Sequence, residues 1–289
     1  MAESISRPLV GRSAIVTGAS RGIGKAIAQR LASAGAHVVI GARSVDRPSG
    51  RFEGTIHETA EAIRANGGHA TPLSVDMTSD VSRQQFVTDA IKATGGIDIL
   101  VNNAGTALYK ETWKYTMAEA MDQMQAYFVG PWQLSNLIIP QMIQRGRGWI
   151  LNLGSSAAVK TPQPPYEEHL RYFGHHVLYA SLKAAIHRFT VGLAAELYEH
   201  NIAVNLVAPV GGVLTPGLDS LDMGFTADHP ACEIPEQMAE AALALVSSEP
   251  RELTGVIGWS HRYLDEIGRS TMSLDGRSVL IQRPKRCEQ

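Results

Sequence analysis

The sequence predicts an α/β fold, a doubly wound parallel β-sheet of about seven strands with helices on both faces. Short β-branched runs alternate with segments of helical periodicity along the chain. A glycine-rich turn joins the first of these runs to the first helical segment. Such an alternation indicates parallel strands joined by right-handed crossovers, which is the arrangement of a doubly wound sheet.

The first half of the chain supplies four of the expected strands. The first is expected at 13–17, where the β-branched run SAIVT stops at a glycine, as a buried strand does. After the glycine-rich turn, apolar residues recur at helical spacing from Ala26 to the stop at Gly35. The further strands of this half are expected at 37–43, 70–76 and 97–105, and the helices between them at 58–68 and 79–94.

The second half continues the alternation without a linker, internal repeat or low-complexity tract, so residues 1–289 are interpreted as one domain. Strands are expected at 148–156, at 202–209 and, on the sheet edge, at 254–259; helices are expected at 117–144, from 177 to 199 and at 235–248. Three segments stand apart: a substrate-loop insertion near 157–176, a flexible Gly- and Pro-rich lid near 210–232 with a short helix, and a basic, partly disordered tail near 276–289.

Composition excludes several classes of protein. The 289 residues are 44% hydrophobic and carry a net charge of −2, so no overall basic balance favours nucleic acid or an anionic membrane. The two cysteines, Cys232 and Cys287, lie far apart and form no CxxC pair, which argues against a disulfide framework or a cysteine zinc site and favours a reducing cytosol. No secretory signal and no apolar run of about 20 residues is found, so we expect a soluble, cytoplasmic protein without a membrane span.

The glycine-rich turn TGASRGIG at 17–24 predicts a dinucleotide site. Glycine lets the backbone approach a ligand closely, and the helix N-terminus beyond presents free N–H groups to a phosphate. At the first strand–helix junction of a doubly wound sheet, such a turn is typical of dinucleotide binding, although three glycines can also serve only a tight turn. The turn residues predicted to bind the cofactor are Gly18, Ser20, Arg21, Gly22, Ile23 and Gly24.

The end of the second strand indicates which dinucleotide binds. An NAD site usually has an acid there that bonds the ribose 2′-hydroxyl, but this chain has Ala42 followed by Arg43. Arg43 and Arg21 could hold a 2′-phosphate with charge-assisted hydrogen bonds. NADP(H) is therefore the predicted cofactor, with NAD(H) as the alternative; the competing interpretation is that both arginines are solvated surface cations.

Tyr179 and Lys183, in VLYASLKAA at 177–185, are four residues apart and share one face of the expected helix. A cation near a phenol favours the ionised form, and lowering the phenol pKa by roughly three units corresponds to about 4 kcal/mol. A phenol poised in this way can give a proton to a carbonyl oxygen or take one from an alcohol. Tyr179 is thus the predicted general acid and base; the alternative is an ordinary amphipathic helix with a snorkelling lysine.

With these motifs the chain resembles the single-domain, Rossmann-type short-chain dehydrogenases/reductases. The resemblance rests on TGxxxGIG at 17–24, NNAG at 102–105, a serine after the fifth strand and YxxxK at 179–183, in the family's order. It implies that Ser155, rather than Ser156, holds the substrate oxygen and that Lys183 bonds the nicotinamide ribose. It further implies cofactor contacts, each of which could instead be structural, by Asp76, Met77, Asn103, Ala104, Gly105, Pro209, Gly211, Gly212 and Thr215, beside those of Tyr179 and Lys183.

The sequence departs from the family's pattern in several places. Tyr127 stands where members usually carry an asparagine that holds a water of the proton relay; its hydroxyl could take that role, or its ring could enter the core. The segment 160–176 lengthens the interval before Tyr179 and is expected to border the substrate pocket. His175 and His176 lie in it, but adjacent histidines without partners at ligand spacing do not indicate a metal site. The last strand lacks the Asp-Gly-Gly ending common in the family, and a further insertion occupies 44–55.

The leading functional hypothesis is an NADP(H)-dependent oxidoreductase that interconverts a ketone or aldehyde with an alcohol on a hydrophobic or cyclic substrate. Three alternatives stay open: a cofactor-binding sensor or scaffold without turnover, an epimerase or dehydratase that uses the same residues, and a nucleic-acid binder acting through its basic tail. The substrate-facing candidates are Trp113, Tyr166, Tyr172, Phe173, Leu218 and Phe225.

The resemblance also implies a homodimer or homotetramer. The expected helices at 117–144 and from 177 to 199 correspond to those that pair between subunits in the family. Apolar residues on them, such as Met124, Leu193 and Leu197, are therefore expected at a subunit interface.

Overall fold

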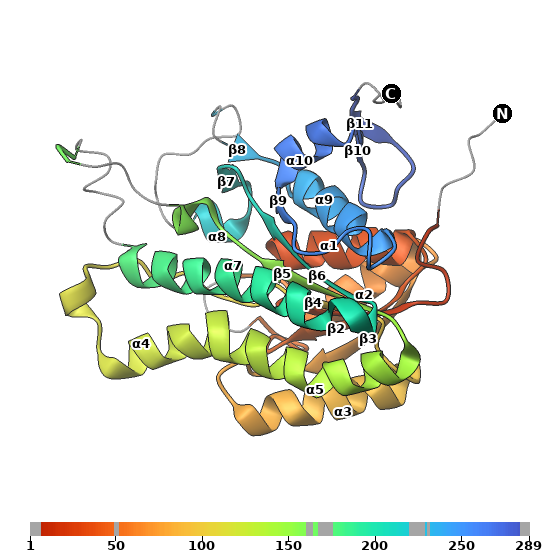
Figure 1. The fold of residues 1–289 in the computed structure, drawn as a ribbon, viewed down its shortest axis with the longest axis horizontal. Coiled ribbons are helices and arrows are strands. Elements are labelled where there is room, and N and C mark those ends of the chain that lie inside the picture. Colours follow the sequence, from red (N-terminus) through yellow and green to blue (C-terminus); the bar gives the residue numbers. More distant parts are fainter. Residues whose placement is uncertain are drawn as a thin grey trace.

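Seven parallel strands form the central sheet of the protein, in the order β3-β2-β1-β4-β5-β6-β9 (Figure 1). The computed structural model describes residues 7–48, 52–159, 164–166, 176–219, 229 and 232–283. The strands are β1 (Ser13–Thr17), β2 (His37–Ala42), β3 (His69–Ser74), β4 (Ile99–Asn102), β5 (Gly148–Leu153), β6 (Ile202–Ala208) and β9 (Ile257–Trp259). Every neighbouring pair is parallel, which confirms the predicted doubly wound sheet.

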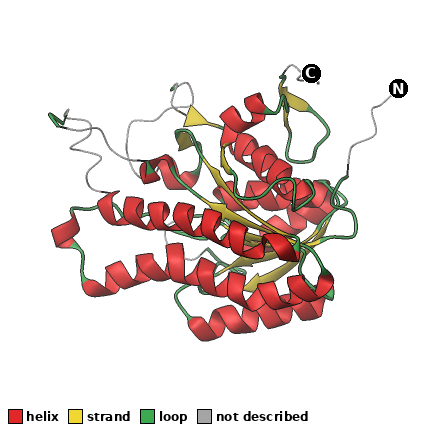
Figure 2. Ribbon diagram, viewed as in Figure 1, coloured by secondary structure: helices red, strands yellow, loops and turns green. Residues whose placement is uncertain are grey.

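Two helical layers enclose this sheet (Figure 2). The helices of one layer are α1 (Gly22–Ser33), α2 (Ile56–Ala65) and α9 (Pro235–Ser247), and those of the other are α3 (Asp80–Thr94), α5 (Gly130–Arg145) and α7 (Val177–Leu197). Because both faces are covered, the central strands β1, β4, β5 and β6 are buried along their whole length. This explains why they read as continuous apolar runs rather than as alternating patterns.

The long helix expected at 117–144 is interrupted. It consists of α4 (Met117–Met124), a π-helical segment (Gln125–Val129) and α5. The N–H of Gly130 bonds to the carbonyl of Gln125, five residues back, and Pro131, which has no N–H to donate, comes next. The wider turn carries Tyr127 toward the centre of the molecule, where it is buried.

The end of the chain also differs from the prediction. The edge strand spans only 257–259, and an unexpected helix, α10 (Ser260–Glu266), follows it directly. The short strands β10 (Thr271–Met272) and β11 (Val279–Ile281) then pair antiparallel. Beyond them Arg283 is buried, where its guanidinium bonds to Asp265 and Thr271. The predicted disordered tail is therefore folded as far as Arg283, and residues 284–289 lie outside the described part.

A buried ion-pair cluster fastens α1 to α9. Glu240 of α9 is only 1% exposed and accepts hydrogen bonds from Arg30 of α1 at 2.7 Å and from Arg269 at 2.6 Å. The two arginines satisfy both oxygens of a carboxylate that has lost its water. The cluster thus joins an early helix to a late one beside the sheet.

The predicted insertion and lid lie mostly outside the described residues. Near the lid, β7 (Gly212–Val213) pairs with β8 (Cys232–Glu233), and α8 (Pro216–Asp219) is a short helix. The candidates that fall outside the described residues are Tyr172, Phe173, His175 and Phe225. Within the described ranges, no helix is both long and apolar enough to cross a bilayer.

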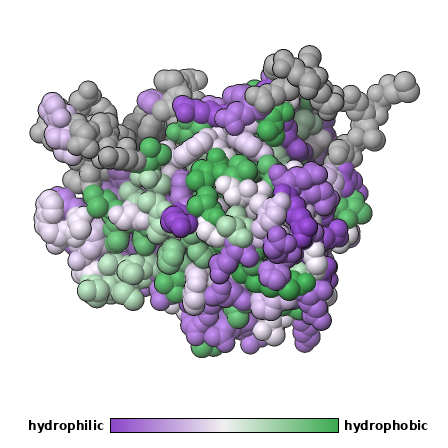
Figure 3. All heavy atoms as spheres, viewed as in Figure 1, coloured by the Kyte–Doolittle hydropathy of each residue, from purple (hydrophilic) through white to green (hydrophobic). Residues whose placement is uncertain are grey.

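Apolar side chains are exposed along α4, where pale green marks methionine and alanine in Figure 3. Met117 is 78% exposed and Met124 is 40% exposed, which leaves Met124 available for a subunit contact. Leu193 and Leu197, in contrast, are packed in the core against α5 and β6. The expectation that these two leucines lie at a subunit interface is therefore wrong, because the sheet of the same chain already covers them.

Candidate active site

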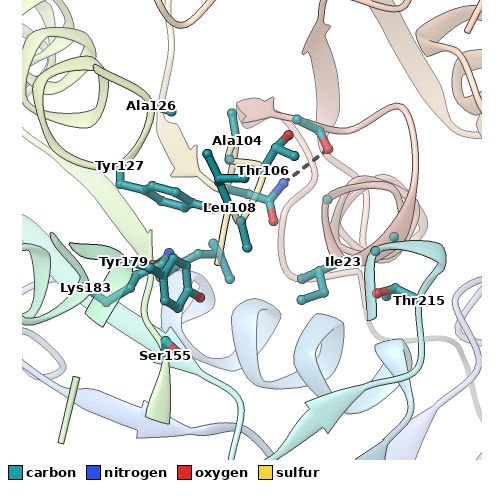
Figure 4. A pocket seen from close by; sticks show the side chains of 18 of the residues that line it. Ile23, Ala104, Thr106, Leu108, Ala126, Tyr127, Ser155, Tyr179, Lys183 and Thr215 are labelled. Atoms are coloured by element: carbon teal, nitrogen blue, oxygen red, sulfur yellow. Dashed lines mark hydrogen bonds between the residues drawn. The ribbon is translucent and has the colours of Figure 1, made fainter. Parts of the chain in front are cut away.

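A cavity of about 1550 Å³ opens at the carboxyl ends of the strands, where the chain order reverses between β1 and β4. All residues predicted to be catalytic or to bind the cofactor line this one cavity. They are Gly18, Ser20, Arg21, Gly22, Ile23, Gly24, Arg43, Asp76, Met77, Asn103, Ala104, Gly105, Ser155, Tyr179, Lys183, Pro209, Gly211, Gly212 and Thr215. Figure 4 shows Ser155, Tyr179 and Lys183 on one side and Ile23 and Thr215 on the other.

The glycine-rich turn is built for close approach. Gly18 has a φ of +68°, and a Cβ added there would lie 2.7 Å from the Cα of Ala104. The side-chain amide of Asn103 donates to the carbonyls of Thr17 at 2.7 Å and Gly18 at 3.2 Å, so it fixes the turn from below. The start of α1, Gly22, lies at the cavity wall. Free N–H groups at this helix start can receive a phosphate, so the turn fits a dinucleotide.

The two arginines at the cavity differ in their bonding. The guanidinium of Arg21 donates to the carbonyl of Phe52 at 2.6 Å, to the Ser44 hydroxyl at 2.8 Å and to the carbonyl of Gly54 at 3.3 Å. Arg21 therefore stabilises the insertion that follows β2, a role that the sequence did not reveal. Arg43 is exposed at the mouth and makes no hydrogen bond or salt bridge to any other described residue. Of the two cations, Arg43 is the one with uncommitted donors.

The loop after β6 is held by a buried acid. Glu233 of β8 is 4% exposed, and its carboxylate accepts from the N–H of Val210 at 2.7 Å and from that of Gly211 at 3.4 Å. The Ser260 hydroxyl donates to its second oxygen. Burial raises the pKa of Glu233, against the effect of these hydrogen bonds. Glu233 thus anchors the stretch that carries Pro209, Gly211 and Gly212 into the cavity, and no sequence motif pointed to it.

Ser155, Tyr179 and Lys183 come together at the end of β5. Ser155 is buried beside the cavity, where its Oγ accepts from the N–H of Ala157 at 3.1 Å. Tyr179 and Lys183 stand one turn apart on α7, as their spacing predicts. Tyr109 packs against Tyr179, and Ser155 lies beside both catalytic candidates of α7 in the cavity (Figure 4). The structure therefore places a serine hydroxyl and a second tyrosine next to one phenol.

The Lys183 ammonium contacts groups other than Tyr179 as well. Lys183 is 6% exposed, and its ammonium donates to the carbonyl of Leu153 at 2.7 Å and lies 4.8 Å from the ring centre of Tyr127. Burial lowers the pKa of Lys183 to about 7. Burial likewise raises the pKa of Tyr179, and the groups that oppose this rise are Ser155 and Tyr109, not Lys183. The ammonium is thus directed to the carbonyl of Leu153, and its effect on the phenol pKa together with an oxidised nicotinamide stays a prediction.

Tyr127 is expected from the sequence either to offer its hydroxyl to the proton relay or to enter the core with its ring. The ring is buried, but it lies in the wall of the cavity. It meets the Tyr179 ring edge-on, with centroids 5.2 Å apart and an interplanar angle of 84°. A Cβ on Gly105 would lie 2.3 Å from the Tyr127 ring, so glycine is needed for this approach. Tyr127 therefore faces the site with its ring.

Besides Glu233, sequence reasoning missed two side chains of the site. Tyr109, on the loop after β4, packs against Tyr179 with ring centroids 5.4 Å apart. His187 accepts a hydrogen bond from the N–H of Ser155 at 3.4 Å, and burial together with the charge of Lys183 lowers its pKa to about 4. The signal for His187 was available, because it follows Lys183 by one helical turn. Tyr109 carried no such signal.

The predicted substrate-facing residues are only partly placed. Leu218 lines the cavity, as do Leu108, Tyr109 and Val177. Trp113 and Tyr166 are 81% and 51% exposed and do not line it. His176, whose pKa burial lowers, packs against Tyr109 with ring centroids 5.9 Å apart. Among the residues described, no three His, Cys, Asp or Glu side chains are arranged to hold a metal ion.

Known proteins share this fold and are similar to this chain in sequence. A family model described as short chain dehydrogenase matches residues 12–223. Hydroxysteroid dehydrogenase-like protein 2 of Danio rerio is 35% identical over 247 residues, which are 86% of this chain and 56% of that protein; the chain thus spans little more than half the length of this relative. A 7α-hydroxysteroid dehydrogenase complexed with NADH and 7-oxo glycochenodeoxycholic acid is similar over 89% of this chain and 95% of its own, with a TM-score of 0.75 and 32% identity. A metagenomic short-chain oxidoreductase in complex with NADP is similar over 86% and 96%, with a TM-score of 0.68 and 28% identity.

Proposed function

Because the chain belongs to the short-chain dehydrogenase/reductase family, we propose that it is an NADP(H)-dependent oxidoreductase that interconverts a ketone or aldehyde with the corresponding alcohol. The observation that carries the proposal is the meeting of Ser155, Tyr179 and Lys183 in the cavity that the glycine-rich turn also lines. A nicotinamide bound in this cavity would supply or accept the hydride.

The side chains of the cluster would share the work on the substrate oxygen. Tyr179 would give its proton to that oxygen during reduction and take one back during oxidation. Ser155, which lines the same cavity, would hold the substrate oxygen beside Tyr179. Lys183 uses one N–H on Leu153, so its other donors would be left for the ribose hydroxyls.

Arg43 supports the proposed preference for NADP(H). It is exposed at the end of β2, and Ala42 occupies the position where an acid would repel a 2′-phosphate. Replacing Arg43 by alanine should raise the KM for NADPH by about tenfold to hundredfold, the value of one charge-assisted hydrogen bond, and leave the KM for NADH unchanged. An equal loss for both cofactors would show that Arg43 does not read the phosphate.

We further propose a hydrophobic or cyclic carbonyl substrate of up to steroid size. The support is the volume of the cavity, the apolar side chains of Leu108, Val177 and Leu218 in its wall, and the similarity to hydroxysteroid dehydrogenases. A homodimer or homotetramer in the cytoplasm completes the proposal. The exposed methionines of α4 support association, and sedimentation of the purified chain would measure it.

The deciding experiment follows NADPH oxidation with a panel of cyclic ketones, oxo-steroids and straight-chain carbonyls. We expect turnover with the cyclic members and a loss of about 10²- to 10⁴-fold in the Tyr179→Phe variant, as for removal of a general acid. Saturable NADPH binding without oxidation across the panel would favour a cofactor-binding sensor or scaffold instead. A product at the oxidation level of the substrate would point to an epimerase or dehydratase.

A further inference from the structure

The ammonium of Lys183 is buried beside the site with few polar partners. Its Nζ donates a hydrogen bond to the carbonyl of Leu153 at 2.7 Å. Among the described residues it has no second hydrogen-bond acceptor and no carboxylate as an ion-pair partner. A buried charge is costly unless other groups replace the water that it has lost. The place of this ammonium therefore calls for a second source of attraction.

The ring of Tyr127 is the nearest such source. The Lys183 Nζ lies over this ring, 4.8 Å from its centre, and 5.7 Å from the ring centre of Tyr179. An aromatic face attracts a cation within about 6 Å of the ring centre, most strongly where both have lost their water, and Tyr127 is itself buried. Its hydroxyl, in contrast, makes no hydrogen bond to any residue of the described ranges. The contact with Lys183 is therefore made by the ring.

Three features of the fold hold the Tyr127 ring in this place. The π-helical segment widens the turn that carries it toward the cavity. The missing Cβ of Gly105 leaves room for the ring, because a methyl group there would overlap it. The edge-on contact with the Tyr179 ring, at a centroid distance of 5.2 Å, fixes its tilt. Figure 4 shows the ring next to Tyr179 and Lys183. The orientation of the aromatic face is thus built into the fold.

We propose that Tyr127 is a positioning residue for Lys183, whose ammonium is held between the face of the Tyr127 ring and the carbonyl of Leu153. The other N–H groups of the ammonium are then left for the ribose hydroxyls of a bound cofactor. The inference rests on the proposed function for this ribose contact. It assigns the Tyr127 ring a role of its own, different from offering a hydroxyl and from filling the core. Tyr127 makes and breaks no bond in the reaction.

The ring should also favour the charged form of Lys183. This effect opposes burial, which lowers the pKa of Lys183 to about 7. The other titratable groups around the ammonium are Tyr179 and His187 on α7 and Tyr127 itself. Burial raises the pKa of both phenols, and the pKa of His187 is lowered to about 4, so these three groups are uncharged near pH 7. The charge that changes there is that of Lys183.

The test changes the charge distribution of the ring and keeps its shape. Tyr127→Phe is the reference, and mono-, di- and trifluorinated phenylalanine at position 127 weaken the attraction of the ring for a cation step by step. The midpoint of Lys183 in the folded chain is read from the pH dependence of the unfolding free energy, as the difference between each protein and the same protein carrying Lys183→Met. We expect this midpoint to fall along the series by about one pH unit in all, the effect of losing one desolvated cation–π contact. The rise of the unfolding free energy with pH then begins at a lower pH.

A control series and a second measurement complete the test. The same fluorinated residues in place of Phe86, a buried ring of α3 that packs on Gly41, should leave the Lys183 midpoint unchanged. The KM for NADPH should rise along the series at position 127 by about tenfold in all. A midpoint that stays constant along this series overturns the inference, even if Tyr127→Leu lowers activity, since the ring would then only fill space. The midpoint is measured without substrate, so turnover by Tyr179→Phe as fast as by the parent would overturn the proposed function alone.

Discussion

Replacing Lys183 by methionine removes a buried ammonium and keeps a side chain of similar length, so the free energy of unfolding should lose a component that depends on pH. Burial lowers the pKa of Lys183 from 10.5 to about 7 in the folded chain. Between these two values the unfolded chain binds a proton that the folded chain has released. The free energy of unfolding therefore rises with pH between these two pKa values. The full gain is present above the pKa of the unfolded chain, and it is lost as the pH falls to the pKa of the folded chain.

The magnitude follows from the shift. Between about pH 7 and about pH 9 the parent should gain about 2 kcal/mol of unfolding free energy from Lys183 alone, at about 1.4 kcal/mol for each unit of pH over which only the unfolded state is charged. Lys183→Met should show no such gain. At neutral pH the variant should also be the more stable of the two, although the carbonyl of Leu153 then loses its donor, which costs about 1–3 kcal/mol.

The assay is urea unfolding followed by tryptophan fluorescence, for parent and variant at a series of pH values. The difference between the two curves above pH 7 isolates Lys183, because His187, the group whose pKa the charge of Lys183 lowers, titrates below this window. Lys92→Met, on the exposed surface of α3, is the matched control and should run parallel to the parent. Parallel curves for Lys183→Met as well would refute the reasoning, since the ammonium could not then have lost its water.

Three further changes test other parts of the structure. Glu233→Ala leaves two loop N–H groups without an acceptor, and the dissociation constant for NADP(H), measured by nicotinamide fluorescence, should rise about tenfold; an unchanged constant would mean that the loop holds its shape alone. Gly105→Ala forces a methyl group into the ring of Tyr127, so kcat should fall strongly while the melting temperature falls only slightly. A loss of stability with normal kcat would show that the contact between Gly105 and Tyr127 does not shape the site. Glu240→Gln leaves Arg30 with a buried, uncompensated charge, and chemical denaturation should show a loss of about 3–5 kcal/mol; a loss below about 1 kcal/mol would indicate that water reaches the cluster.

Local sequence patterns were sufficient to predict most strands of the sheet. They failed for elements whose structure depends on packing against distant parts of the chain. The run SAIVT and the glycines after it defined β1 and its turn, because a buried strand and a tight turn are each specified by a few neighbouring residues. The helix α10 begins at Ser260, directly after a strand, and is held by the burial of Tyr263 and Leu264 against α9. No start signal of its own marks it in the sequence.

In the site, motif spacing identified the residues but not all of their contacts. The four-residue interval correctly put Tyr179 and Lys183 on one face of α7. It could not reveal that the ammonium turns to the carbonyl of Leu153, which belongs to strand β5. Tyr109 was missed for the same reason, because its contact with Tyr179 joins two segments that no local pattern relates.

The ion pair between Arg30 and Glu240 can form only late in translation, since 210 positions separate its partners. At translation speeds of about 5–20 residues per second, α1 waits roughly 10 to 40 seconds before its carboxylate leaves the ribosome. During that wait the apolar flank of α1 that α9 later covers stands bare, which is the condition under which chaperones are recruited. The helix that follows the glycine-rich turn, although translated early, is therefore among the last to be covered.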